Sequence, residues 1–208
     1  MTGCRRSMMK ALSGLAVATL LLAAGCAQTV PPPTLHVLSP VAAEGAAAPG
    51  SPTAARGPAV GIELANIPEY LDRPEIVSRT SANTLQVSQG SRWGERLQVN
   101  VTRVVAQNLR SLLPSDQVFV LPLRRTEPLD YTVALDISSF ERNADGVVVL
   151  NAYWTVLDGK TEAERAGARV NYSEPAGEDA ESIVAAMNRT LNALSRDIAA
   201  GIKRPARR

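Results

Sequence analysis

Histidine and cysteine are almost absent from this sequence, which contains one histidine, His36, and two cysteines, Cys4 and Cys26. A Cys/His nucleophilic site or a tetrahedral zinc site needs several such side chains, so the composition disfavours both. The sequence also lacks a glycine-rich phosphate loop that follows a strand and opens a helix. We therefore expect no catalytic constellation, no metal and no cofactor.

Aromatic residues and excess charge are scarce as well. Aromatics make up 4% of the chain, so the core must be built mainly from Val, Leu, Ile and Ala. The 22 basic and 20 acidic residues nearly balance, and removal of Arg5, Arg6 and Lys10 with an N-terminal signal would leave 19 basic residues against 20 acidic ones. A near-neutral chain has no basic surface for nucleic acid, and we expect none as a partner.

The first 25 residues have the pattern of a lipoprotein signal peptide. Arg5, Arg6 and Lys10 form a positive segment, and residues 11–24 form an apolar run of about 14 residues, the length expected of a signal peptide. As a helix this run would reach about 21 Å, short of the roughly 30 Å hydrocarbon core of a membrane. Small residues lead directly to Cys26, which we expect to be lipidated as the first residue of the mature chain.

Lipidation would decide where the protein is held. One acyl chain anchors only marginally, whereas the two or three chains of a lipoprotein, such as palmitate, would hold Cys26 on a membrane. Ala27, not aspartate, follows the cysteine, which resembles the sorting signal for the outer membrane. Cys4 would be discarded with the signal peptide, so the mature chain could form no internal disulfide.

Residues 26–58 are dominated by Pro, Ala, Gly and Ser. Such a composition cannot bury enough apolar surface to form a core, so we expect a tether. Its ends would lie roughly 30 Å apart as a flexible coil and about 100 Å apart when fully stretched. Within the tether, alternation in residues 35–38 predicts a short strand that docks on the domain. Residues 59–203 are enough for one domain, and residues 204–208 form a basic tail.

The domain is predicted to be α+β, with a mostly antiparallel sheet. Strand-like runs cover residues 60–67, 75–79, 84–88, 117–121, 131–140, 147–156 and 164–172. The last three are long and are separated by turn residues, which is typical of an antiparallel meander. After a loop at 89–92, apolar spacing predicts a helix over 93–113 with Ser91 as its N-cap, and a second helix over 179–202. We expect both helices on one face of the sheet.

Charged residues are embedded among strand-like apolar ones in one segment, and these residues are our candidate site. They are Tyr70, Leu71, Asp72, Arg73, Pro74 and Arg79, together with Arg92 and Trp93 downstream. One interpretation is a structural corner in which acids pair with arginines and Trp93 is a hydrophobic plug. The other is a partner-binding surface. The residue types favour the structural corner.

The same residues carry a resemblance to a known family. The lipobox, the stretch Leu35, Leu38, Ser39 and Pro40, then YLDRPEIVSR and RWGERL resemble the PqiC-like auxiliary lipoproteins of ABC-type transport systems. The resemblance covers nearly all of the mature chain. His36 departs from the family pattern, which usually has a tyrosine there.

The resemblance implies a non-enzymatic partner of an MCE-domain lipid-transport assembly that links the inner and outer membranes of Gram-negative bacteria. The lipid anchor would hold the domain on the periplasmic face of the outer membrane, where it would contact the MCE-domain protein and support envelope integrity. Homo-oligomerisation stays open, as do the lipid and the direction of transport.

Two other functions are compatible with the sequence. The first is a lipoprotein for outer-membrane assembly or secretion that is unconnected with lipid transport, since small α+β periplasmic domains serve several machines. The second, more distant, is a membrane-anchored hydrolase. A hydrolase would require Asp72, Glu75 and Asp130 to cluster in a deep pocket.

Overall fold

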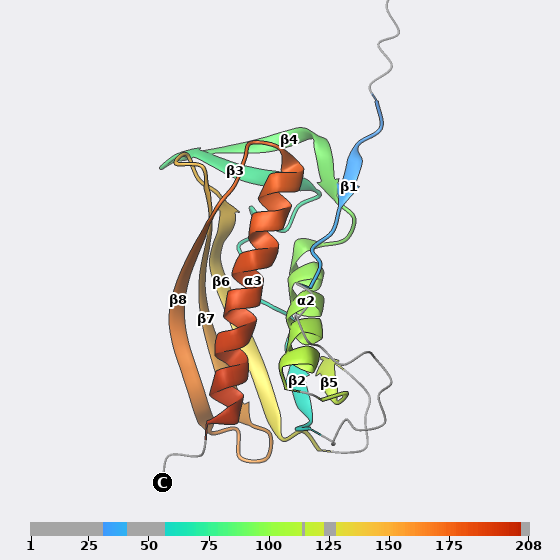
Figure 1. Ribbon diagram of the computed structural model, residues 1–208, viewed down its shortest axis with the longest axis vertical. Helices are drawn as coiled ribbons and strands as arrows, with labels where there is room; N and C mark the ends of the chain where they lie inside the picture. Colours follow the sequence, from blue (N-terminus) through green and yellow to red (C-terminus); the bar gives the residue numbers. More distant parts are fainter. Residues whose placement is uncertain (1–30, 41–56, 114, 123–127, 205–208) are drawn as a thin grey trace, which may run out of the picture. The chain divides into compact units, whose positions relative to one another are not determined.

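A computed structural model describes residues 31–40, 57–113, 115–122 and 128–204 of the chain. Within these ranges the chain forms two helices and one eight-stranded mixed sheet, so the expected α+β class is confirmed (Figure 1). The elements are β1 (Thr34–His36), β2 (Val60–Ile62), β3 (Glu75–Ser81), β4 (Thr84–Trp93), α2 (Leu97–Leu112), β5 (Val118–Val120), β6 (Tyr131–Arg142), β7 (Val147–Asp158), β8 (Glu164–Pro175) and α3 (Ala180–Lys203).

The three long strands β6, β7 and β8 form the antiparallel meander that the sequence predicts. Alternate residues of β7 are buried along its whole length, because successive side chains point to opposite faces of a sheet. The β6–β7 turn places Gly146 at φ 79°, a left-handed conformation that glycine adopts without steric cost. The meander therefore supplies one buried apolar face for the helices and one partly exposed face.

Strand β6 is the centre of the sheet and joins its two parts. One edge of β6 pairs with β7, and the other pairs in parallel with β2 at its start and with β3 at its end. An isolated parallel bridge between Asn66 and Asp136 lies between these two pairings. The expected strand over 60–67 is therefore too long, because β2 ends at Ile62 and only the Asn66 bridge continues its path.

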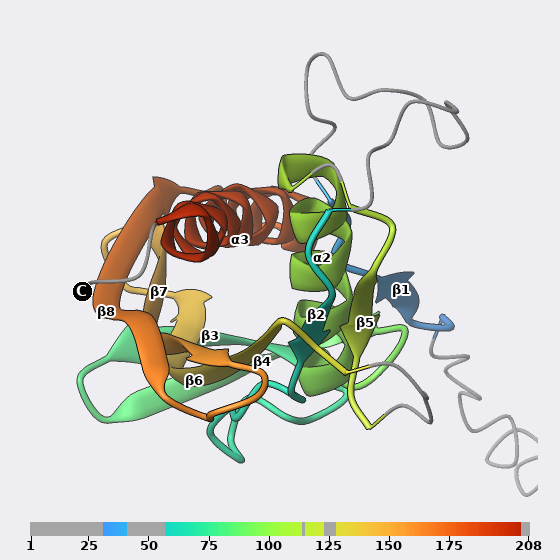
Figure 2. The same cartoon turned by 90° about the horizontal axis from the view of Figure 1, so that it is seen from below.

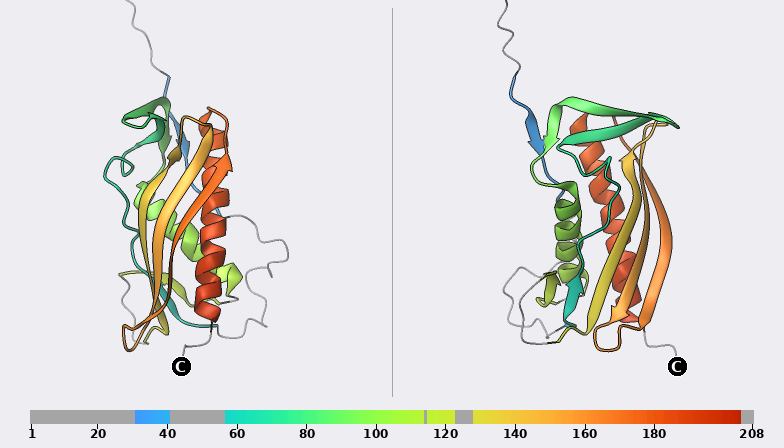
Figure 3. Two further views of the ribbon diagram at one scale, coloured as in Figure 1. Left: turned by 90° about the vertical axis from the view of Figure 1, so that its left-hand side faces the viewer. Right: turned by 180° about the vertical axis from the view of Figure 1, so that it is seen from behind.

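Both helices lie on the concave side of the curled sheet (Figure 2). Helix α3 packs over β7 and β8, and α2 packs against α3 and β5 (Figure 3). The apolar face of α3 is fully buried at Leu191, Leu194 and Ile198. Near its C-terminal end, a Cβ at Gly201 would lie 2.7 Å from Cη2 of Trp154, so only glycine permits this close approach of helix to sheet.

Two expectations about the start of α2 are wrong. The helix begins at Leu97 and not at residue 93, and Ser91 is not its N-cap, because residues 89–93 continue strand β4. This end of β4 is held by pairing with β1, where Ser91 faces Thr34. The N-cap position is occupied by Arg96, which makes no side-chain cap hydrogen bond. A pairing with a distant segment thus overrides the local helical pattern.

The contact of α3 with β8 includes a tyrosine whose titration can be followed. The hydroxyl of Tyr172 donates a hydrogen bond to the carboxylate of Asp197, and partial burial and this carboxylate raise the pKa of Tyr172. The unfolded chain releases the phenolic proton near pH 10, so the stabilisation by protonated Tyr172 is present below about pH 10 and is lost as the pH rises further. We expect Tyr172→Phe to lose less stability than wild type between pH 9 and 11 in urea unfolding followed by circular dichroism. An equal loss in both proteins would contradict this assignment.

Candidate functional site

The segment that follows the predicted anchor is attached to the folded domain by backbone and side-chain contacts. Strand β1 pairs in parallel with β4, and the backbone N–H of Gly94 donates to the carbonyl of His36 at 2.8 Å. Leu38 is 1% exposed and belongs to the main core. Its carbonyl accepts a hydrogen bond from Arg103 at 3.1 Å, and the backbone N–H of Ser39 donates to Asn188 Oδ1 at 3.1 Å. Residues 34–39 are therefore an integral part of the domain.

Truncation of the buried leucine tests this attachment. We expect Leu38→Ala to lower the free energy of unfolding by about 2–4 kcal/mol, because it leaves a cavity in the core. Leu35→Ala is the matched control: Leu35 is 65% exposed in the same short segment, and its truncation should leave stability nearly unchanged. Urea unfolding measures both variants, and hydrogen exchange at the Gly94 amide reports detachment of β1. Equal unfolding midpoints for the two variants would show that the segment does not contribute to the core.

The first and last residues of the YLDRPEIVSR segment meet on a carboxylate from β6. Glu141 is 4% exposed and accepts a hydrogen bond from Arg79 Nε at 2.8 Å and one from the Tyr70 hydroxyl at 3.2 Å. The backbone N–H of Phe140 donates to Glu141 Oε2 at 2.7 Å. The guanidinium of Arg79 also lies 5.6 Å from the centroid of the Tyr70 ring. Burial and the charge of Glu141 raise the pKa of Tyr70, so the phenol stays protonated as a donor.

Glu141 is absent from the candidates predicted from the sequence, although it is the acceptor at the centre of this cluster. It directly follows the buried Phe140, so alternation assigns it to the polar outer face of the sheet. It is buried where the side chains of Tyr70 and Arg79 contact its carboxylate. A glutamate directly after an apolar strand residue is a weak signal, and only the distant covering segment makes it significant.

The other candidate residues take separate structural places in this corner. Leu71 and Trp93 are buried in the core, at 2% and 6% exposure. Two ion pairs lie in the corner: Asp72 pairs with Arg96, and Arg73 pairs with Glu75 at 2.9 Å. The backbone N–H of Trp93 donates a hydrogen bond to the carbonyl of Pro74 at 2.7 Å. Arg92 is exposed on β4. Of the candidate residues, Tyr70 and Arg79 therefore share one cluster at Glu141, and the others make separate contacts in the same corner.

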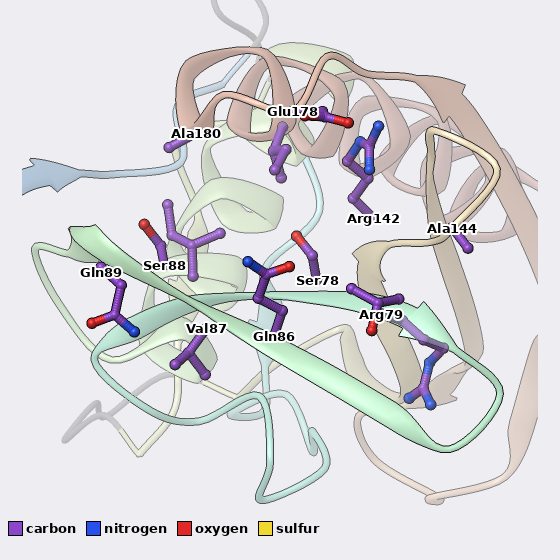
Figure 4. A pocket seen from close by; sticks show the side chains of 13 residues that line it. Ser78, Arg79, Gln86, Val87, Ser88, Gln89, Arg142, Ala144, Glu178 and Ala180 are labelled. Carbon is purple, nitrogen blue, oxygen red and sulfur yellow. The ribbon is translucent and has the colours of Figure 1, made fainter.

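A groove lies between the β3–β4 hairpin and the beginning of α3 (Figure 4). Its volume is about 490 Å³. Ser78 and Gln86, which are cross-strand partners, point from the hairpin toward Glu178 and Arg142. The guanidinium of Arg142 donates to the carbonyl of Ala176 at 3.3 Å. The groove therefore presents hydroxyl, amide and charged side chains that can form hydrogen bonds.

The acidic residues that a hydrolase would need do not cluster. Asp72 and Glu75 are engaged with Arg96 and Arg73. Asp130 accepts a hydrogen bond from the backbone N–H of Ala59 at 2.8 Å, at the start of β6 and far along the strand from the corner. In the described ranges no group of three or more His, Cys, Asp or Glu side chains could hold a metal ion.

The predicted lipidation site, Cys26, lies outside the described residues, as do the signal peptide and the end of the basic tail. Among the helices that the structure describes, none is both long and apolar enough to cross a membrane.

Comparisons with known proteins add a family and a fold. A family model for the ABC-type transport auxiliary lipoprotein component matches residues 36–199. The crystal structure of an uncharacterized protein superposes with a TM-score of 0.66 at 16% identity, covering 83% of this chain and 100% of that one. Protein XCC0632 from Xanthomonas campestris, of the DUF330 family, superposes with a TM-score of 0.57 at 18% identity, covering 80% and 90%. The search of curated proteins found no match.

Proposed function

Since the chain belongs to the family of ABC-type transport auxiliary lipoprotein components, we propose that it is a non-enzymatic partner of an MCE-domain protein in an ABC-type lipid-transport system. In this proposal the mature protein is anchored through acyl chains on Cys26 to the periplasmic face of the outer membrane. Its folded domain binds the MCE-domain protein and so supports lipid passage and envelope integrity.

The observation that carries the proposal is the extent of the family match. Residues 36–199 include all but the first two residues of the docked 34–39 segment, the corner around Glu141, the whole meander and most of α3. A match of this extent covers the domain as a unit and not a single motif. It therefore supports a role that the intact domain performs within a transport system.

The chemistry of the described surfaces supports binding as the mode of action. In two acid–arginine pairs of the corner, Arg79–Glu141 and Arg73–Glu75, the partners are engaged with each other. The groove beside the hairpin has the charged residues Arg79, Arg142 and Glu178 in its lining. Among the described residues of the corner and the groove, no serine or threonine hydroxyl hydrogen-bonds a carboxylate as a nucleophile would bond its general base, whereas the groove offers hydrogen-bonding groups for a protein partner.

Co-purification tests the partner. The full-length chain with a C-terminal tag is expressed at its native level, solubilised from envelopes with mild detergent, and captured. We expect the MCE-domain protein and the ABC permease and ATPase to co-purify, and deletion of the gene to raise permeability to large hydrophobic antibiotics. Capture of an outer-membrane assembly or secretion machine without the transporter, combined with an intact permeability barrier in the deletion strain, would overturn the proposal.

A further inference from the structure

The docked N-terminal segment limits how far the domain can stand from a membrane anchor. The chain is fixed to the domain from Thr34 onward by the pairing of β1 with β4. Residues 27–33 are all that separates Cys26 from Thr34. A chain of that length spans at most about 25–30 Å when fully extended. The reach expected for a tether running to residue 58, about 100 Å, is therefore not available to the domain.

Two exposed apolar side chains lie at this attachment point. Leu35 is 65% exposed and Val37 is 52% exposed, the two largest values among the large hydrophobic residues of the described chain. They are two residues apart on an extended segment and so project to the same side. Gly94 lies under both: a Cβ at Gly94 would be 3.1 Å from Val37 Cγ1 and 4.0 Å from Leu35 Cβ. The two side chains thus lie beside the backbone of Gly94, which has no side chain to cover them, and they project from the surface.

A positive charge lies next to this apolar pair. Leu35 is the cross-strand partner of Arg92, and partners in a parallel ladder project from the same face. Arg92 is exposed and therefore lies beside the leucine at the surface. Exposed aliphatic side chains with an arginine at their edge match the chemistry of a phospholipid surface, where the aliphatic groups enter the boundary of the acyl region and the guanidinium binds phosphate.

We propose that Leu35, Val37 and Arg92 form a membrane-resting surface that lies on the bilayer to which Cys26 is attached. The occupant of this surface is the phospholipid bilayer, because the chain between the anchor and β1 is too short to carry the surface far from it. The inference rests on the lipid anchor of the proposed function. The membrane-resting surface adds an orientation to the proposed function. The end of the domain with β1 faces the membrane, and the end with β2, β5 and the last turn of α3 faces away from it (Figures 1 and 3).

Single introduced cysteines make the orientation measurable. The mature chain has no cysteine besides Cys26, so Val37→Cys can be labelled with an environment-sensitive fluorophore in the full-length lipidated protein. Lys160→Cys is the matched control, since Lys160 is exposed in the β7–β8 turn at the opposite end of the domain. Both labelled proteins are reconstituted into vesicles of phosphatidylethanolamine and phosphatidylglycerol that contain spin-labelled lipids.

We expect the probe at position 37 to be quenched by lipids labelled near the headgroup, at a depth of about 5–10 Å, and the probe at position 160 to keep the intensity that it has in quencher-free vesicles. Equal quenching at the two positions, or none at position 37 in vesicle-bound protein, overturns the orientation and leaves the proposed function intact. A probe at position 37 that is shielded both from lipid quenchers and from aqueous iodide indicates a second copy or another protein on this surface, and also overturns it. Protein that carries no acyl chain by mass spectrometry overturns both the orientation and the anchor.

Discussion

Cys26→Ser is expected to abolish lipidation and, with it, the contribution of the protein to the envelope barrier. In the proposed function the Cys26 thiol accepts the lipid, and serine offers no thiol to the modifying enzyme. Under that proposal a domain without two or three acyl chains would have no stable attachment to the membrane. Mass spectrometry of the N-terminal peptide reports the acyl chains, and permeability to large hydrophobic antibiotics reports function. The expected phenotype is that of the gene deletion.

Two further variants make this result interpretable. Cys4→Ser is the matched control, because Cys4 precedes the predicted cleavage site and should be lost during processing, so this variant should behave as wild type. In the Cys26→Ser protein an uncleaved apolar run at 11–24 could itself hold the precursor on the inner membrane. Replacement of residues 1–26 by a cleavable secretory signal peptide removes that run and releases the domain. Full barrier function from the released domain would show that the anchor is dispensable.

The elements that could be predicted from the sequence are those whose own residues repeat with the period of a strand or a helix over several turns or residue pairs. The meander strands alternate over their whole length, and α3 repeats its apolar positions over many turns, so local sequence determines their type. The three-residue strands β2 and β5 carry too little periodicity to set their limits, and their parallel pairings depend on segments far away in the chain. Local sequence predicts a loop and a helix start at the end of β4 for the same reason: its partner, β1, lies more than fifty residues earlier in the sequence.

The candidate site shows the same division between local and distant information. Charge patterning singled out Tyr70 and Arg79, because acids and arginines among apolar strand residues are unusual. It could not identify Glu141, whose burial depends on a segment about seventy residues earlier folding over it. Composition predicts a tether over 26–58 and alternation predicts a docking strand at 35–38, but neither pattern identifies Arg103 and Asn188, whose side chains hydrogen-bond Leu38 and Ser39. A contact between distant residues has no local signature.

The charge cluster at Glu141 predicts a large and asymmetric loss of stability. Arg79→Met should lower the free energy of unfolding by about 3 kcal/mol, because it leaves a buried carboxylate without its cation. Glu141 is 4% exposed, whereas the Arg79 side chain is 30% exposed. A released arginine can therefore turn to water, and Glu141→Gln should cost less than Arg79→Met. Urea unfolding of both variants, followed by circular dichroism, measures the difference.

The double variant separates a charge effect from a loss of packing. With Arg79→Met and Glu141→Gln combined, no unpaired charge is buried, and part of the loss caused by Arg79→Met should be recovered. Arg73→Met is the matched control, because Arg73 pairs with Glu75 at the exposed surface of the same corner, where removal of the cation should leave the unfolding midpoint nearly unchanged. If the double variant is as unstable as the sum of the two single losses, the arginine acts through its packing on Tyr70 and not through the carboxylate.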